Sequence, residues 1–374
     1  MATTTAPDRA TSILTVDLDA IVANWRLLGD RARPAACAAV VKADAYGMGA
    51  TRVAPALAAA GCATFFVATI DEALDLRPHI PGAELFVLNG LLPGTEALFD
   101  AHGLIPVLNT LDQIAGWRAH ARARGQSRPA AIHIDTGMNR LGLEAGQVAR
   151  IAEDKTLLAG IETRLVMSHM ACADEEGSPM NPAQRDRFAT LSALLPGRRS
   201  LGASSTIFLG PDYQFDLVRP GAALYGVNPT PHRPNPMAGI ARLEAKILQV
   251  RDVDTPMTVG YGATHRVVGK SRIATVAAGY ADGYFRSLGN RGHGVIGGHL
   301  VPVVGRVSMD LITVDVGHLP ADAVRPGMMM ELIGPHHDVD ALAAEAGTIG
   351  YEILTNAGRR AFRRYVGGSI PATT

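Results

Sequence analysis

The chain has 374 residues, too many for one small domain and enough for two domains or for a barrel with an addition. Basic and acidic side chains number 35 each, so the formal net charge is zero and gives no electrostatic reason to expect nucleic acid or a membrane as a partner. The three cysteines are scattered and the twelve histidines form no metal-type cluster, which favours a cytoplasmic protein with reduced thiols and no metal site.

Apolar runs alternate with helical patterns over the first two thirds of the chain. Residues 18–28 place apolar side chains at helical spacing. Eight β-rich runs follow, separated by mostly helical segments, at residues 36–43, 64–70, 84–90, 104–110, 129–137, 163–170, 198–204 and 216–226. Continuous apolar runs are typical of buried parallel strands, and eight such units predict a (β/α)8 barrel. The rival is an open doubly wound sheet, which usually has fewer strands; no GxGxxG fingerprint follows the first run.

A proline-rich segment divides the chain. Residues 228–239 contain four prolines and predict a linker. Beyond it, short strand candidates are split by glycine-rich turns, at residues 245–253, 272–279, 299–307, 310–317 and 328–334. We therefore predict an α/β fold in which an N-terminal TIM-type barrel, residues 10–235, precedes a mainly β C-terminal domain, residues 236–374.

Polar side chains gather where the predicted barrel strands end, which is where a barrel carries its catalytic groups. These residues are Lys42, His133, Asp135, Ser168, His169, Ser204, Ser205 and Arg219. Apolar surroundings lower the pKa of an amine, so Lys42 is a candidate nucleophile for Schiff-base chemistry. The alternative is a lysine that reaches solvent past the strand end. Gly221 follows a proline at a strand end, where backbone amides can bind a phosphate.

Segments from residue 13 to about 366 resemble, in order, those of the alanine racemase family. The resemblance is carried by "LTVDLDAIVANWRLL", "VVKADAYGMG", "HIDTGMNRLG", "RPGAALYG", "VGYGATH", "GYADGY", "GRVSMD" and "YEILTNAGRRAFRRYVG". One such motif alone is weak, whereas the ordered set across both predicted domains is highly specific.

The resemblance implies an isomerase that uses pyridoxal phosphate to interconvert L-alanine and D-alanine, either to supply D-alanine for peptidoglycan or to degrade it. The lysine that carries the cofactor falls on Lys42. The groups that bind the cofactor's phosphate fall on Tyr46, Ser205, Gly221, Ala222 and Tyr351. The histidine stacked on the ring falls on His169, and the arginine bonded to the ring nitrogen falls on Arg219.

The resemblance also implies a head-to-tail homodimer whose sites lie at the subunit boundary. The arginine near the cofactor's hydroxyl and the substrate carboxylate falls on Arg140. The second catalytic base, a tyrosine from the partner subunit, falls on Tyr261, and the partner's substrate-binding groups fall on Tyr284, Met309 and Asp310.

The chemistry agrees with these roles. Racemisation removes a proton from one face of Cα and delivers one to the other face, so two bases are expected, Lys42 and Tyr261. A tyrosine, with an ordinary pKa of ~10, serves as a base only if its pKa is lowered or matched by a polar neighbour. Arginine keeps its proton, so a ring nitrogen beside Arg219 stays unprotonated, which limits side reactions such as transamination.

Two positions depart from the family pattern. Many members carry a carbamylated lysine seven residues before the loop arginine, where this chain has His133, and the usual cysteine of the substrate loop is Ser308. Both changes leave racemisation as the expected reaction and strict alanine specificity open. The alternatives are a racemase of broader range and a fold-related decarboxylase of basic amino acids. A cofactor-carrier protein on the same barrel would lack the second domain and Tyr261, and a metal-dependent aldolase would need a metal-ligand cluster.

Overall fold

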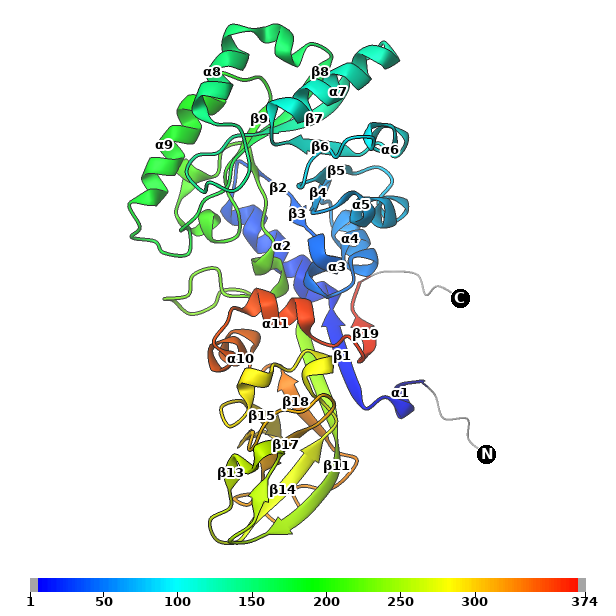
Figure 1. Ribbon diagram of the computed structural model, residues 1–374, viewed down its shortest axis with the longest axis vertical. Helices are drawn as coiled ribbons and strands as arrows, with labels where there is room; N and C mark the ends of the chain where they lie inside the picture. Colours follow the sequence, from blue (N-terminus) through cyan, green and yellow to red (C-terminus); the bar gives the residue numbers. More distant parts are fainter. Residues whose placement is uncertain (1–5, 369–374) are drawn as a thin grey trace.

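The computed structural model describes residues 6–368 and divides them into a barrel and a β-rich part (Figure 1). Residues 369–374, the end of the predicted second domain, lie outside the described residues. In Figure 1 the barrel occupies the upper half and the β-rich part the lower half, with two helices near the C-terminus at the junction.

Eight parallel strands form a closed barrel. They are β2 (Ala36–Cys37), which continues as β3 (Ala39–Val40), then β4 (Thr64–Val67), β5 (Glu84–Val87), β6 (Ile105–Leu108), β7 (Arg128–His133), β8 (Ile161–Met167), β9 (Arg198–Ser200) and β10 (Leu217–Val218). Strands β3 to β9 follow one another in a parallel sheet, and β10 pairs with β2. The ring closes because the Arg219 N–H donates to the Gly202 carbonyl at 2.8 Å. The predicted barrel is confirmed, and the open sheet is excluded.

Helices lie outside the barrel strands. They are α2 (Leu18–Arg31), α4 (Ala50–Ala59), α5 (Ile70–Leu76), α6 (Glu96–Ala101), α7 (Leu111–Arg124), α8 (Ala145–Glu153) and α9 (Met180–Ser192), with the short α1 (Ala6–Arg9) and α3 (Lys42–Tyr46). After β9 and β10 the connections are the 3-10 turns η3 (Ser205–Phe208) and η5 (Ala222–Tyr225). None of the helices in residues 6–368 combines the length and the apolarity that crossing a membrane requires.

The β-rich part is built on a mixed sheet that includes the first strand of the chain. Its strands are β1 (Ser12–Asp17), β11 (Ala241–Val253), β14 (Ser271–Val276), β15 (His293–Ile296), β16 (His299–Pro302), β17 (Ile312–Asp315), β18 (Met329–Ile333) and β19 (Phe362–Val366). The hairpin β12 (Thr258–Val259) and β13 (His265–Arg266) and the helices α10 (Val339–Ala346) and α11 (Gly350–Asn356) complete it. Strand β1 pairs antiparallel with β11 and parallel with β19, so the chain starts in this sheet before it enters the barrel.

A buried asparagine on α2 joins the barrel to the linker. Asn24 is 2% exposed. Its amide nitrogen donates to the Ala238 carbonyl at 2.9 Å and to the Leu224 carbonyl at 3.2 Å, and its oxygen accepts the Ala238 N–H at 2.8 Å. Because Leu224 belongs to η5, this one side chain fastens α2, the turn after β10 and the linker to one another.

We expect Asn24→Ala to lower the free energy of unfolding by about 2–3 kcal/mol, because it leaves buried backbone groups of Leu224 and Ala238 without partners. Urea unfolding of the intact protein measures the change. Arg26→Ala, on the exposed side of the same helix, is the matched control and should change the free energy by less than about 0.5 kcal/mol. Equal effects of the two substitutions would contradict the role given to Asn24.

Candidate active site

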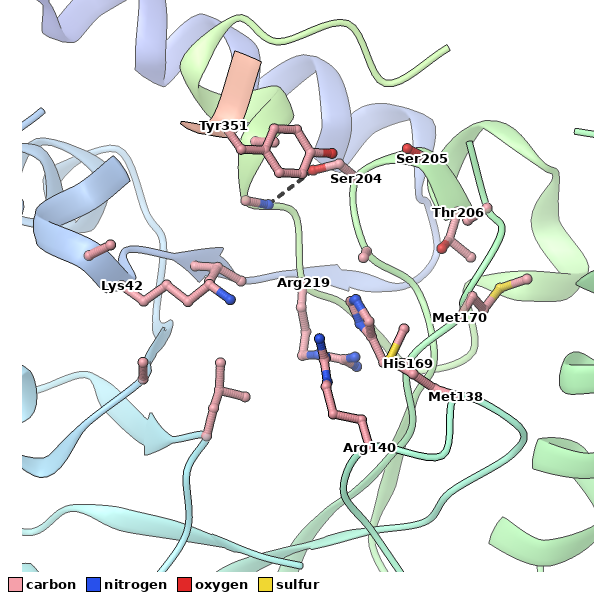
Figure 2. A pocket seen from close by; sticks show the side chains of 18 of the residues that line it. Lys42, Met138, Arg140, His169, Met170, Ser204, Ser205, Thr206, Arg219 and Tyr351 are labelled. Carbon is pink, nitrogen blue, oxygen red and sulfur yellow. Dashed lines mark hydrogen bonds between the residues drawn. The ribbon is translucent and has the colours of Figure 1, made fainter. Parts of the chain in front are cut away.

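A cavity of about 980 Å3 lies at the carboxyl ends of the barrel strands. Its lining includes these residues predicted from the sequence: Lys42, Tyr46, Arg140, His169, Ser205, Arg219, Gly221, Ala222 and Tyr351. Figure 2 shows Lys42, Arg140, Arg219 and His169 converging on one space, with Tyr351 of α11 on the side of Ser204 and Ser205. The fold therefore brings together groups that come from five strand ends and one distant helix.

Lys42 projects from a turn of unusual handedness at the end of β3. The four residues after it, 43–46, have φ of 53–54°, a region that residues other than glycine rarely adopt. Two carboxylates hold the turn: Glu72 accepts the Ala43 N–H at 2.7 Å, and Asp44 accepts the Ala50 N–H at 2.8 Å. Burial and, next, the positive charge of Arg140 lower the pKa of Lys42, whereas Glu72 opposes the shift. The amine is thus both aimed into the cavity and biased toward its neutral, nucleophilic form.

Backbone donors gather where η3 and η5 begin. The Ser204 hydroxyl accepts the Gly221 N–H at 3.1 Å and the Ala223 N–H at 3.2 Å, which fixes the turn after β10. The N–H groups of Ser205, Thr206 and Ala222 have no acceptor among the described residues, and the Thr206 hydroxyl is buried without a partner. Such a set of unsatisfied donors suits an anion.

Tyr46 forms the wall of this anion-binding turn. A Cβ atom on Gly221 would overlap the Tyr46 hydroxyl, so the turn needs glycine at this position. The Tyr46 ring stacks on Tyr225 with centroids 4.7 Å apart and meets the edge of Tyr351 at 6.3 Å. Burial raises the pKa of the Tyr46 and Tyr351 hydroxyls. Both hydroxyls therefore stay protonated and can donate to an anion.

Arg219 is a buried cation held by uncharged groups. It is 4% exposed and donates to the Ser200 carbonyl at 2.8 Å, to the Ser200 hydroxyl and to the Ser168 carbonyl at 2.6 Å. No carboxylate within residues 6–368 forms an ion pair with it. Burial lowers the pKa of Arg219 to about 9, so the guanidinium remains charged at neutral pH.

Two histidines in the cavity are neutral. Burial, followed by the positive charges of Arg219, Arg140 and Lys42, lowers the pKa of His169 to about 3. Burial and Arg219 also lower the pKa of His133 to about 4, with Asp135 opposing the shift. At pH 7 both rings are therefore uncharged, and the permanent cations of the site are the two arginines.

A closed loop after β7 presents Arg140. Asp135 accepts the N–H groups of Gly137 and Met138, each at 2.9 Å. The Leu143 N–H returns to the His133 carbonyl at 2.8 Å, which closes the loop at its base. The Arg140 guanidinium points into the cavity (Figure 2) and makes no hydrogen bond or ion pair within the part of the chain that the structure describes.

Three groups near the site were not singled out from the sequence: Thr206, Glu72 and Asn109. Asn109 follows β6 and accepts from the His133 ring at 2.7 Å. The strand-end argument that selected Lys42, His169 and Ser204 applies to Asn109 as well, whereas the role of Ser204 as the cap of the anion-binding turn is visible only in the structure. Glu72 lies in the first turn of α5 and forms a capping box with Thr69. This local sequence pattern does not predict that Glu72 also accepts a hydrogen bond from the Ala43 N–H.

The remaining predicted residues do not line the cavity of their own chain. Tyr261 is 72% exposed and Met309 is 55% exposed. The Met309 segment lies against Tyr280, because the Tyr280 N–H donates to the Ser308 carbonyl at 3.0 Å. The Tyr261 segment lies against the start of the same loop, because a Cβ atom on Gly260 would lie 3.2 Å from the Arg306 backbone nitrogen. Asp310 pairs with Arg360 at 2.7 Å. These side chains form an exposed group on the β-rich part.

The prediction for Tyr284 needs correction. Its side chain is 2% exposed and its hydroxyl donates to the His293 carbonyl at 3.4 Å, inside its own domain. A ring so enclosed cannot reach a substrate held by another chain. The tyrosine of this turn that does reach the surface is Tyr280, which is 44% exposed and lies beside Met309.

Comparison with known proteins identifies the family. The model of the alanine racemase N-terminal domain matches residues 16–229, and that of the alanine racemase C-terminal domain matches residues 240–365. The chain belongs to the alanine racemase family. Alanine racemase from Rhodospirillum rubrum is 54% identical over 363 residues, which are 96% of this chain and 97% of that protein. The enzyme from Rhizobium meliloti is 47% identical over 96% of this chain and 98% of its own length.

Solved structures of alanine racemases have the same fold. The crystal structure of alanine racemase from Bartonella henselae with covalently bound pyridoxal phosphate matches with a TM-score of 0.92 and 41% identity, over 96% of this chain and 100% of that chain. The biosynthetic alanine racemase from Pseudomonas aeruginosa matches with a TM-score of 0.87 and 33% identity, over 96% and 100% of the two chains. The resemblance read from the sequence motifs is confirmed, and so is the α/β barrel followed by a β-rich part.

His133 should make stability depend on pH. Its pKa is about 4 in the folded protein and ~6.5 when unfolded, so between these values only the unfolded chain binds the proton. Stability is therefore lost as the pH falls from ~6.5 toward 4, by up to about 1.4 kcal/mol per pH unit. His133→Leu removes this loss, and urea unfolding of both proteins at several pH values measures the difference. A pH dependence as steep in His133→Leu as in the unsubstituted protein would refute the buried neutral state; His102→Gln, at an exposed position, is the control.

Proposed function

We propose that this chain is an alanine racemase that interconverts L-alanine and D-alanine with pyridoxal phosphate. The observation that carries the proposal is the convergence, in one cavity, of a lysine with a lowered pKa, a buried arginine and a set of unsatisfied anion donors. Membership of the family supports it, since the relatives in the comparison are alanine racemases.

The cavity offers a group for each part of pyridoxal phosphate. The N–H groups of Ser205 and Ala222 and the hydroxyls of Tyr46 and Tyr351 suit the phosphate, beside the space that Gly221 leaves open. The neutral ring of His169 suits stacking on a flat heterocycle, and Arg219 offers a donor to the ring nitrogen. Lys42 supplies the amine for covalent attachment. When bound, the cofactor delocalises the negative charge that develops at Cα.

Proton transfer and ligand binding are carried out by different residues of the chain. The neutral amine of Lys42 accepts or returns a proton on one face of Cα. Tyr261 of the partner subunit serves the other face. Arg219 donates a hydrogen bond without giving up its proton, because a guanidinium stays charged at neutral pH. Arg140, whose donors have no acceptor among residues 6–368, binds the substrate carboxylate.

We propose that two copies of the chain share each site. The barrel, which begins after β1, binds the cofactor, and the part from residue 236 onward extends into the partner's site. The support is that Tyr261 and Met309 are exposed and lie outside the cavity of their own chain. In this arrangement Tyr280 takes the role expected of Tyr284, and Asp310 holds the Met309 segment through Arg360.

The proposed setting is the cytoplasm, where the enzyme supplies D-alanine for peptidoglycan. The three cysteines, Cys37, Cys62 and Cys172, are free thiols. Burial raises the pKa of Cys37 and Cys62, so these two thiols are kept in the unreactive protonated form. Free thiols are the ordinary state of cysteine in a reducing compartment.

The purified protein with pyridoxal phosphate should convert L-alanine to an equal mixture of both enantiomers, measured by chiral chromatography. Lys42→Ala should abolish conversion, because it removes the attachment point and one base. Lys155→Ala, an exposed lysine in a turn after α8, should behave like the unsubstituted protein. Retained conversion in Lys42→Ala would reject the assignment, and a panel of other L-amino acids distinguishes an alanine racemase from a racemase of broader range.

Mixing two inactive variants tests the shared site. In a hybrid of Lys42→Ala and Tyr261→Phe subunits, one of the two sites combines an intact lysine with an intact tyrosine. After subunit exchange we expect activity to recover to about a quarter of the unsubstituted level, since half of the dimers are hybrids and half of their sites are intact. Recovery that stays at the level of the separate variants would mean that both residues act within one chain.

A further inference from the structure

Two hydrogen-bonding groups in the cavity lack partners that their chemistry requires. His133 ends β7, is 8% exposed and lines the cavity. Arg140 lines the same cavity from the loop that β7 feeds. The proposed reaction uses Arg140 to bind the carboxylate and assigns no role to His133. Buried polar side chains are usually hydrogen-bonded, so a buried imidazole at a strand end without an assigned role calls for an explanation.

The tautomer of His133 follows from its neighbour. Asn109 donates its amide N–H groups to the Val107 carbonyl at 3.0 Å and to the Leu88 carbonyl at 3.3 Å, which turns its oxygen toward the histidine. That oxygen lies 2.7 Å from His133 Nδ1. An amide oxygen only accepts, so Nδ1 carries the hydrogen. In the neutral ring Nε2 is then an acceptor, and no donor within residues 6–368 occupies it.

Arg140 supplies the complementary donors. Its loop is fixed at the base by Asp135, whose oxygens are already engaged by backbone N–H groups of the loop. The guanidinium itself is not bonded in the described part of the chain. The positive charge of Arg140 is one cause of the lowered pKa of His133, as expected of neighbours. A neutral acceptor holds a guanidinium in place without cancelling the charge that a carboxylate substrate needs.

We propose that His133 is a positioning residue for Arg140: when the cofactor and the substrate fill the cavity, Nε2 of His133 accepts a hydrogen bond from the guanidinium, whose other N–H groups then face the substrate carboxylate. Asn109 sets the tautomer that makes this possible. The inference rests on the proposed racemase function, because it takes alanine's carboxylate as the group that Arg140 binds. The rival partner for Arg140 is Asp174, a carboxylate that also lines the cavity.

Kinetics of two substitutions test the proposal. Arg140 binds the carboxylate before and during the reaction alike, so His133→Leu should raise KM for alanine about tenfold and leave kcat within about threefold. His133→Gln keeps a neutral acceptor and should restore most of the loss, and the exposed His102→Gln is the control. An unchanged KM in His133→Leu would overturn the proposal. A KM for alanine that rises in Asp174→Asn but not in His133→Leu would also overturn the proposal, because the carboxylate of Asp174 would then be the partner of Arg140. So would a KM that falls when chloride is added, because an anion would then be the partner. Failure of the unsubstituted protein to racemise alanine would instead reject the proposed function.

A measurement independent of activity uses nitrogen-15 NMR of labelled histidines in the full-length protein with pyridoxal phosphate and alanine bound. We expect His133 to be neutral at pH 7 with its hydrogen on Nδ1. The Nε2 signal should move in Arg140→Leu, because its hydrogen-bond donor is gone, and the Nδ1 signal should move in Asn109→Leu. A hydrogen on Nε2, or an Nε2 signal that Arg140→Leu leaves in place, would disprove the positioning role even if KM had changed.

Discussion

The site depends on a positive charge that is buried, among residues 6–368, without a negative partner. The carbonyls of Ser168 and Ser200 hold Arg219, and because no carboxylate of these residues forms an ion pair with it, its charge acts on neighbouring groups through a region of low dielectric. It contributes to the low pKa of both His133 and His169. The cavity consequently contains neutral imidazoles, permanent cations and an amine with a reduced proton affinity, a combination that accepts an anionic ligand and leaves a nucleophile free.

The closed barrel is what makes this arrangement possible. Apart from Tyr351 of α11, the contributing residues lie at the end of a parallel strand or in the loop that follows it, and parallel strands of a barrel end on one face. The local backbone nevertheless has to be held in place: a left-handed turn costs roughly 1–2 kcal/mol per residue, and the four residues after Lys42 adopt it. Glu72 and Asp44 oppose that cost with hydrogen bonds to the backbone around the turn. The position of the lysine is therefore tied to a carboxylate on the neighbouring helix α5.

The sequence predicts the barrel well because its signal is local. Most of the barrel strands are apolar runs, with β9 (Arg198–Ser200) as an exception. The polar residues at the strand ends are adjacent to these runs, so Lys42, His169 and Arg219 are found without knowledge of the fold. Pairing between distant segments is not visible in this way: nothing in "ILTVD" indicates that β1 joins β11 and β19. The same limit explains the error at Tyr284. Two tyrosines stand in one short turn, and only burial separates Tyr280 from Tyr284. Ser204 and Ser205 are likewise neighbours with different roles: the Ser204 hydroxyl accepts backbone N–H groups of the turn after β10, and the Ser205 N–H, which has no acceptor in residues 6–368, is a donor for an anion.

The placement of β1 has a consequence for biosynthesis. Ile13 lies opposite Phe362 in the finished sheet, so β1 pairs with a segment that is translated 349 residues later. At ordinary rates of translation this interval is on the order of tens of seconds. The barrel strands can assemble during that time from contacts between neighbours in sequence, whereas the edge of β1 that pairs with β19 stays unpaired until β19 has been translated. The mixed sheet of the β-rich part is thus completed late, and a nascent chain stalled before β19 leaves one edge of β1 open to mispairing.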